Sequence, residues 1–280
     1  MRGARFRVNQ RFPLITIGVL AMGILMLGLS REDADLPGPF PYTGAALSAE
    51  ERARLTSDGW TVTGPDAPPR LVALTRPPSA GETRWLVYFG GNTPGYLAEA
   101  KSVLLSLDEG RGLGLAAIAP PGFDGSPGKP SPEALRDSAA SAMRWLTETH
   151  PAAAQDIHLV GFSMGTMSAL AAAHALRAQD TPARRLVLFA PFQAMKVGRT
   201  GLIGGLVGRH RYDNQPLLLP KRLPPALVLH GGADSALPPA QGERVSRGLR
   251  VPLKTYPGIG HAELLKHPPA LADARQGLGL

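Results

Sequence analysis

Residues 157–165 form the stretch IHLVGFSMG. Its first six residues form an apolar run typical of a buried strand, and the small residues after Ser163 (MGTMSALAAAHAL) are typical of a helix. Between the two lies the only Gly-x-Ser-x-Gly motif of the chain. A sharp strand-to-helix turn strains the serine backbone, and the flanking glycines let strand and helix approach each other. The sequence therefore predicts Ser163 as a nucleophile, with the N–H of Met164 beside the reacting oxygen as an oxyanion donor.

The same alternation of elements continues on both sides of this motif. Strands are predicted at residues 70–75, 84–89, 114–119, 157–162, 185–190, 226–230 and 252–256. Helices are predicted at 96–108, 132–149, 164–178 and 239–249, and from 261 onward. Strands that are apolar along their whole length and alternate with helices indicate an α/β fold, with a mostly parallel central sheet and helices on both faces.

Residues 192–224 interrupt the alternation and are rich in Gly and Arg. We interpret them as a short lid inserted between two strands. Their apolar stretch GLIGGLV at 201–207 suggests a flexible flap that touches a membrane or an acyl chain. A lid helix packed over the site is an equally good interpretation.

A serine hydroxyl needs a base to take its proton, and that base needs an orienting carboxylate. After Ser163, Asp234 follows the predicted strand 226–230, and His261 follows the predicted strand 252–256. Catalytic groups gather beyond the carboxyl ends of the strands in such sheets. We therefore predict that His261 is the base and that Asp234 orients it.

Three other residues compete for these roles. Asp213 is the main rival acid, and His267 is a rival base that is more simply a solvated helix-end residue. His230 is interpreted as structural, a strand-end histidine bonded to backbone groups. His261, Glu263 and His267 lack the His-Glu-x-x-His spacing of a zinc site, so no metal is expected.

A second glycine-rich turn follows the predicted strand 84–89, with the sequence Gly90-Gly91-Asn92. Two glycines let the backbone approach a substrate carbonyl closely. The N–H of Asn92 is therefore predicted to be the second oxyanion donor, beside that of Met164. The alternative is that these three residues only form an ordinary turn.

Together these segments resemble the α/β-hydrolase superfamily, from about residue 71 to the C-terminus. Many members carry His-Gly-Asn at the position of Gly90-Gly91-Asn92, and the backbone donor at Asn92 can survive the loss of that histidine. Residues 122–128 (GFDGSPG) look like a glycine-rich loop of the family, with Asp124 where a glycine is usual. Residues 230–238 match the family's acid segment, and 258–261 its histidine segment. The general likeness is to short-lidded, membrane-attached hydrolases.

The N-terminus carries the pattern of a membrane anchor. Residues 13–29 hold no charge and follow four arginines, at positions 2, 5, 7 and 11, with no acidic residue before Glu32. A helix of this length spans roughly 26 Å, the short edge of what crosses a bilayer. The arginines should stay in the cytoplasm, which sends the rest of the chain across the membrane. A cleaved signal peptide and a buried core helix are the alternatives.

The charge and the composition exclude several classes of function. The net charge is +8, but beyond those arginines only 26 basic residues face 22 acidic ones, without a basic stripe, so nucleic-acid binding is not expected. The chain contains no cysteine, which excludes disulfides, thiolate metal sites and cysteine nucleophiles.

These observations lead to one expected organisation and one expected activity. Residues 1–30 are a basic cytoplasmic tail and signal-anchor helix, 31–44 a linker, and 45–280 an α/β-hydrolase domain outside the cytoplasm. The expected reaction is cleavage of a carboxylic ester or thioester through an acyl-serine, with a small acyl compound as substrate and no cofactor. Acyl transfer, amide hydrolysis and a non-catalytic binding protein of the same fold remain alternatives, and the oligomeric state stays open.

Overall fold

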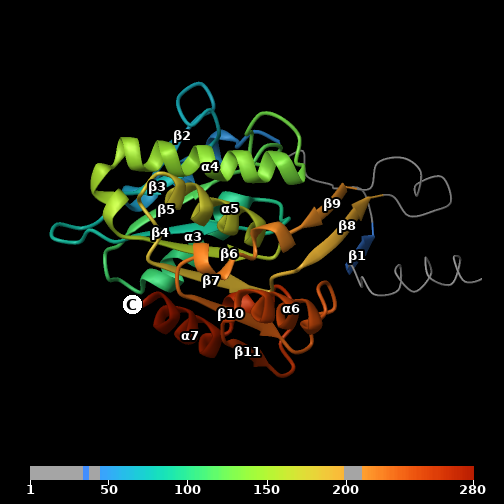
Figure 1. The fold of residues 1–280 in the computed structure, drawn as a ribbon. Helices are drawn as coiled ribbons and strands as arrows, with labels where there is room; N and C mark the ends of the chain where they lie inside the picture. Colours follow the sequence, from blue (N-terminus) through green and yellow to red (C-terminus); the bar gives the residue numbers. More distant parts are fainter. Residues whose placement is uncertain (1–33, 38–44, 199–209) are drawn as a thin grey trace, which may run out of the picture. The chain divides into compact units, whose positions relative to one another are not determined.

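The computed structural model describes residues 34–37, 45–198 and 210–280. Their centre is an eight-stranded sheet with the strand order β11-β10-β7-β6-β4-β5-β3-β2 (Figure 1). The strands are β2 (Thr61–Thr63), β3 (Ala73–Arg76), β4 (Trp85–Phe89), β5 (Gly114–Ile118), β6 (Ile157–Phe162), β7 (Arg185–Phe189), β10 (Ala226–Gly231) and β11 (Leu253–Tyr256). Pairing is parallel from β11 to β5, whereas β3 is antiparallel to both β5 and β2.

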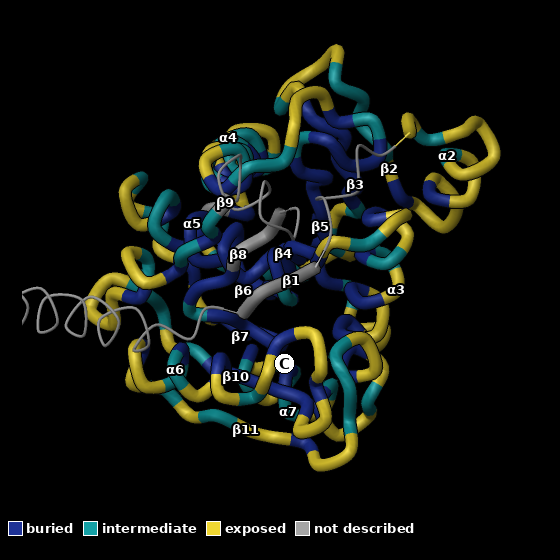
Figure 2. The backbone as a smooth tube through the Cα atoms, turned by 90° about the vertical axis from the view of Figure 1, so that its right-hand side faces the viewer, coloured by how far each residue is buried: buried dark blue, intermediate teal, exposed yellow. Residues whose placement is uncertain are grey.

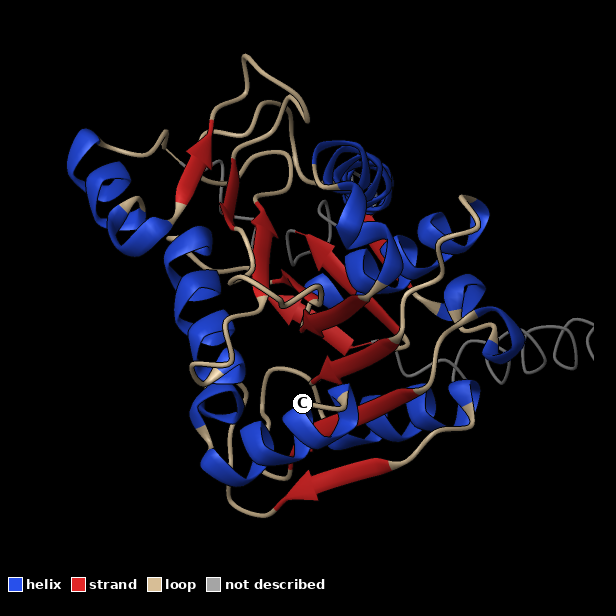
Figure 3. Ribbon diagram, turned by 90° about the vertical axis from the view of Figure 1, so that its left-hand side faces the viewer, coloured by secondary structure: helices blue, strands red, loops and turns tan. Residues whose placement is uncertain are grey.

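Helices cover both faces of this sheet (Figure 3). They are α3 (Tyr96–Asp108), α4 (Pro132–Thr149), α5 (Gly165–Ala178), α6 (Pro239–Leu249) and α7 (Pro268–Leu278), with α2 (Ala49–Leu55) ahead of β2. Side chains of α3 and α7 share one apolar cluster with the sheet, and those of α4, α5 and α6 share a second. The predicted α/β fold, with its mostly parallel sheet covered on both faces, is confirmed.

The apolar runs of the sequence became the core strands. Every residue of β4, β5 and β6 is buried (Figure 2), as expected of strands covered by helices on both faces. The tightest approach is at Gly165, the first residue of α5. A Cβ atom there would collide with the carbonyl oxygens of Phe89 and Gly90, so only glycine lets α5 begin this close to the end of β4.

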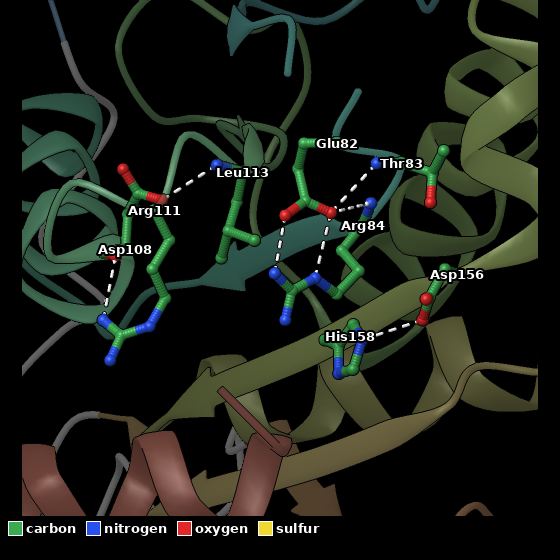
Figure 4. Close-up of polar contacts among 8 residues, drawn as sticks. All are labelled: Glu82, Thr83, Arg84, Asp108, Arg111, Leu113, Asp156 and His158. Carbon is green, nitrogen blue, oxygen red and sulfur yellow. Dashed lines mark hydrogen bonds and ion pairs between the residues drawn. The ribbon is translucent and has the colours of Figure 1, made fainter. Parts of the chain in front are cut away.

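Charged side chains gather at the end of the sheet where the parallel strands begin (Figure 4). His158, the second residue of β6, places Nε2 2.9 Å from the Oδ1 atom of Asp156. Nearby, Glu82 accepts hydrogen bonds from the guanidinium of Arg84, which lower its pKa to about 2. This edge therefore carries ion pairs, and the loops at the carboxyl edge carry the candidate site.

The insertion between β7 and β10, interpreted above as a short lid, is described in part. Its described residues contain β8 (Ala194–Gly198) and β9 (His210–Asp213), which pair antiparallel, followed by two short 3-10 turns, 215–217 and 220–222. Residues 34–37, assigned above to the linker, form β1 (Ala34–Pro37), which pairs parallel to β8. The predicted flap at 201–207 lies outside the described residues.

The predicted signal-anchor at 13–29 also lies outside the described residues. None of the helices in the described part of the chain is long and apolar enough to cross a membrane. The contacts within the chain group residues 34–280 into one compact unit.

Candidate active site

Ser163 lies at the turn that joins β6 to α5. Its backbone φ is 52°, in the left-handed region that a residue with a side chain seldom adopts, as the glycine-flanked motif predicts. Its N–H donates to the carbonyl of Phe189 at 2.9 Å, which ties the turn to the end of β7. A Cβ atom at Gly161 would approach the Thr166 backbone to 2.9 Å, so this glycine also lets strand and helix pack. The turn presents the hydroxyl at the carboxyl edge of the sheet.

The structure brings Ser163, His261 and Asp234 together. The Nε2 atom of His261 lies 2.9 Å from the Ser163 Oγ, and its Nδ1 atom lies 2.6 Å from the Asp234 Oδ2. The imidazole is partly buried and packs against the ring of Phe162, with 4.9 Å between ring centroids and a tilt of 37° between the rings. These are the distances of a serine hydroxyl, a base and an orienting carboxylate acting in series.

Asp234 is held as an ionised carboxylate. Its Oδ1 atom accepts the N–H groups of Ala236 at 3.0 Å and Leu237 at 2.8 Å. Burial by itself would raise the pKa of Asp234, but its contacts with His230 and His261 and the Leu237 N–H outweigh burial and hold that pKa well below its usual range. A carboxylate that stays ionised can orient a histidine and stabilise its protonated form.

The rival residues lie elsewhere. Asp213 ends β9, where its carboxylate accepts the N–H of Gln215 and pairs with Arg211 at 3.3 Å. His267 precedes α7 and sets its ring edge-on to Tyr256, with centroids 5.2 Å apart. His230 is fully buried and bonds the carbonyl oxygen of Leu237 at 2.9 Å, in keeping with the structural role expected for it.

The glycine-rich turn after β4 lies against the serine. A Cβ atom at Gly91 would stand 3.1 Å from the Phe162 ring and 3.3 Å from the Cβ atom of Ser163, so a side chain there would be tightly packed. In the described part of the chain, no hydrogen-bond acceptor pairs with the N–H of Asn92 or Met164. Both residues stay predicted oxyanion donors.

Two residues that hold this turn were not predicted. The hydroxyl of Tyr96, buried at the start of α3, accepts the N–H of Gly90 at 2.8 Å. Asp124 accepts the N–H of Leu97 at 2.7 Å and so caps α3, whose own cap residue, Gly95, has no side chain to do this. The departure from glycine at position 124 was visible in the sequence, but its partner 27 residues away was not.

A second carboxylate, Glu99 on α3, lies within electrostatic reach of His261. It accepts a hydrogen bond from the buried Tyr88 hydroxyl at 3.0 Å. Burial raises the pKa of Glu99, and the Tyr88 hydrogen bond and the positive charges of His261 and Lys266 offset part of that rise. No pattern in the sequence pointed to this residue.

Within the described residues, no group of three or more His, Asp or Glu side chains could hold a metal ion. The chemistry that these side chains offer is nucleophilic attack with proton transfer.

Comparisons with known proteins agree on the fold. No protein-family model matches the chain. It is 27% identical over 277 residues to the uncharacterized protein Rv2307c of Mycobacterium tuberculosis, covering 95% of this chain and 92% of that protein. Among solved structures, an esterase of Pyrobaculum calidifontis is similar with a TM-score of 0.57 and 17% identity, over 82% of this chain and 90% of that one. An α/β serine hydrolase without a lid from Xanthomonas campestris gives a TM-score of 0.54 and 19% identity, over 79% and 92%.

Proposed function

We propose, from the α/β-hydrolase fold that this chain has, that the protein is a serine hydrolase cleaving a carboxylic ester or thioester. The observation that carries the proposal is the series of contacts from Ser163 Oγ to His261 Nε2, at 2.9 Å, and from His261 Nδ1 to Asp234 Oδ2, at 2.6 Å. The strained φ of Ser163 adds support, because such strain clusters at functional sites.

The reaction proceeds in two halves. The Ser163 Oγ attacks the carbonyl carbon while His261 Nε2 takes its proton, and the N–H groups of Asn92 and Met164 bind the oxyanion. The tetrahedral intermediate collapses, and His261 returns the proton to the leaving alkoxide or thiolate. The acyl group is now bonded to Ser163. Water then attacks the acyl carbon through the same base, releasing a carboxylic acid and the free serine. Asp234 keeps its negative charge throughout.

The proposal predicts that a fluorophosphonate probe labels Ser163. Ser163→Ala should lose both labelling and turnover of p-nitrophenyl esters, by at least about 10³-fold, because the proposed acyl bond forms on the Ser163 Oγ. Ser168→Ala, on the buried face of α5, is the matched control and should keep both. Peptide mapping of the labelled protein identifies the modified residue.

Two results would contradict the proposal. Labelling of Ser163→Ala at the wild-type rate would move the nucleophile elsewhere. A wild-type protein that folds and takes up no probe would favour a binding protein of the same fold.

We also propose that residues 1–30 anchor the protein in a membrane, with residues 45–280 outside the cytoplasm. The support is the uncharged run 13–29 and the four arginines before it. Fusion of a reporter enzyme to the C-terminus, active only outside the cytoplasm, tests the orientation. A reporter that is active only inside the cell would refute it.

A further inference from the structure

The acid of the candidate triad has a second histidine beside it. The Nε2 atom of His230 lies 3.4 Å from the Asp234 Oδ2, the same oxygen that His261 contacts. Both side chains, His230 and Asp234, are fully buried. Two imidazoles thus meet Asp234 at the same oxygen, a partly buried one beside the serine and a fully buried one in the core.

The hydrogen of His230 is on Nε2. That nitrogen lies 2.9 Å from the carbonyl oxygen of Leu237, which can only accept. Leu237 in turn donates its N–H to the Asp234 Oδ1 at 2.8 Å. These contacts therefore link His230, Leu237 and Asp234 in a ring. The Nε2–H of His230 points between the carbonyl oxygen of Leu237 and the carboxylate oxygen Oδ2 of Asp234.

Close packing fixes the ring in this position. A Cβ atom at Gly242, inside α6, would collide with the Nδ1 atom of His230. That Nδ1 atom is buried and has no hydrogen-bond partner within the described residues. Glycine is unfavourable inside a helix, and here the ring leaves no room for a larger residue.

We propose that His230 is a positioning residue for the reaction: it holds the Asp234 carboxylate so that Oδ2 faces His261. This inference rests on the proposed function of Ser163. The polar contacts of His230 are with Leu237 and Asp234, so it acts on the reaction through Asp234. His230 does more than hydrogen-bond the backbone that follows β10. The bond to the Leu237 carbonyl alone would not require the His230 Nε2 atom to lie beside the Asp234 Oδ2.

The test compares His230→Leu with His230→Gln in the full-length protein. Leucine removes the donor, whereas the side-chain amide of glutamine can place an N–H near the position of Nε2. His230→Leu should lower kcat and the rate of fluorophosphonate labelling by about 10- to 100-fold, as expected for one lost contact with a buried charge, with KM nearly unchanged. His230→Gln should recover most of this loss.

His174→Leu is the matched control. The Nε2 atom of His174 also bonds a backbone carbonyl, that of Leu217, at 2.9 Å, but far from Asp234 in the chain. Active-site titration with the probe corrects each preparation for misfolded protein. A merely structural role of His230 would cost thermal stability in both leucine variants and leave kcat per labelled site unchanged.

The outcomes separate the two proposals. If wild-type Ser163 takes up no probe, the proposed function fails, and this inference fails with it. If wild type is labelled and folded His230→Leu keeps full kcat, only the role of His230 is refuted. If His230→Leu does not fold, Gly242→Ala decides, because it displaces the ring without removing the donor. A folded Gly242→Ala protein with full kcat would overturn the proposal, and a lowered kcat with constant KM would support it.

Discussion

At the scale of single residues, Ser163 and His158 lie at opposite ends of the same strand, β6. The serine carries backbone strain, which costs on the order of 1–3 kcal/mol and is held by the surrounding turn. His158 is unfavourable for a different reason, its burial. It is only 6% exposed, and its Nδ1 atom is buried without a hydrogen-bond partner in the described part of the chain. The backbone strain thus belongs to the residue with the proposed reactive hydroxyl, and the unpaired buried nitrogen belongs to a titratable group in the core.

Burial of His158 predicts a pH-dependent stability. Burial lowers the pKa of His158, and the nearby Asp156 carboxylate offsets part of that effect. The unfolded chain therefore binds a proton near pH 6.5 that the folded chain does not yet bind. The free energy of unfolding should fall as the pH falls below about 6.5, and it should stop falling once the folded protein binds that proton too.

Urea unfolding at a series of pH values between about 7.5 and 5 measures this dependence. His158→Gln keeps a donor toward Asp156 but does not titrate, so its stability should depend less on pH than that of wild type. Some dependence should remain, because burial also lowers the pKa of His150. Identical pH dependence in the variant and the wild type would show that His158 does not titrate in this way.

At the scale of elements, α3 begins in an unusual way. Its first turn is capped from another loop by Asp124, whereas α2 and α4 are capped by their own preceding serines, Ser48 and Ser131. Asp124 adopts φ 46°, a left-handed backbone conformation that glycine adopts without strain. Glycine therefore also suits this position, as in the α/β-hydrolase superfamily that the chain resembles. Because α3 follows the turn of Gly91 and Asn92, its cap also supports the candidate oxyanion site.

Loss of this cap should destabilise the domain. Asp124→Gly fits the backbone but removes the acceptor of the Leu97 N–H, and it should lower the free energy of unfolding by about 1–2 kcal/mol. Asp124→Asn keeps an acceptor oxygen and removes a buried charge, so its loss should be smaller. Ser131→Ala, which removes the cap of α4, gives the reference value for a lost cap. Equal stability of the Gly and Asn variants in urea unfolding would argue against capping by Asp124.

At the scale of the whole molecule, the proposed anchor and the domain should be separable. Every contact of the candidate site lies within the compact unit 34–280. Strand β1 at 34–37 pairs with β8, so a truncation should end before residue 34 rather than at the end of the predicted linker. Deletion of 1–30 should release a protein that leaves the membrane fraction and reacts with the probe at the wild-type rate.

Deletion of 1–44 is the matched comparison. It also removes β1 and should lower the thermal unfolding temperature relative to the shorter deletion. Failure of the protein lacking 1–30 to fold would mean that residues 13–29 belong to the core. A full-length protein found only in the soluble fraction would refute the anchor.

The core strands, the main helices and the turn at Ser163 were predictable from the sequence. The apolar runs of β4 to β7 and the turn at Ser163 are local patterns, set by residues a few positions apart, so strand, helix and strained turn could be predicted without tertiary contacts. The positions of Ser163, Asp234 and His261 were likewise predictable, because each lies beyond the end of a predicted strand.

Only the tertiary structure decided which groups meet. His261 and Ser163 are 98 residues apart, and the choice of Asp234 over Asp213 depends on β10 lying beside β11 and β7. The antiparallel pairing of β3, the sheet of β1, β8 and β9, and the cap of α3 by Asp124 also join distant segments. The physical reason is range: backbone preference and hydrophobic period act over a few residues, whereas a strand partner or a buried hydrogen bond is chosen by the packing of the whole domain.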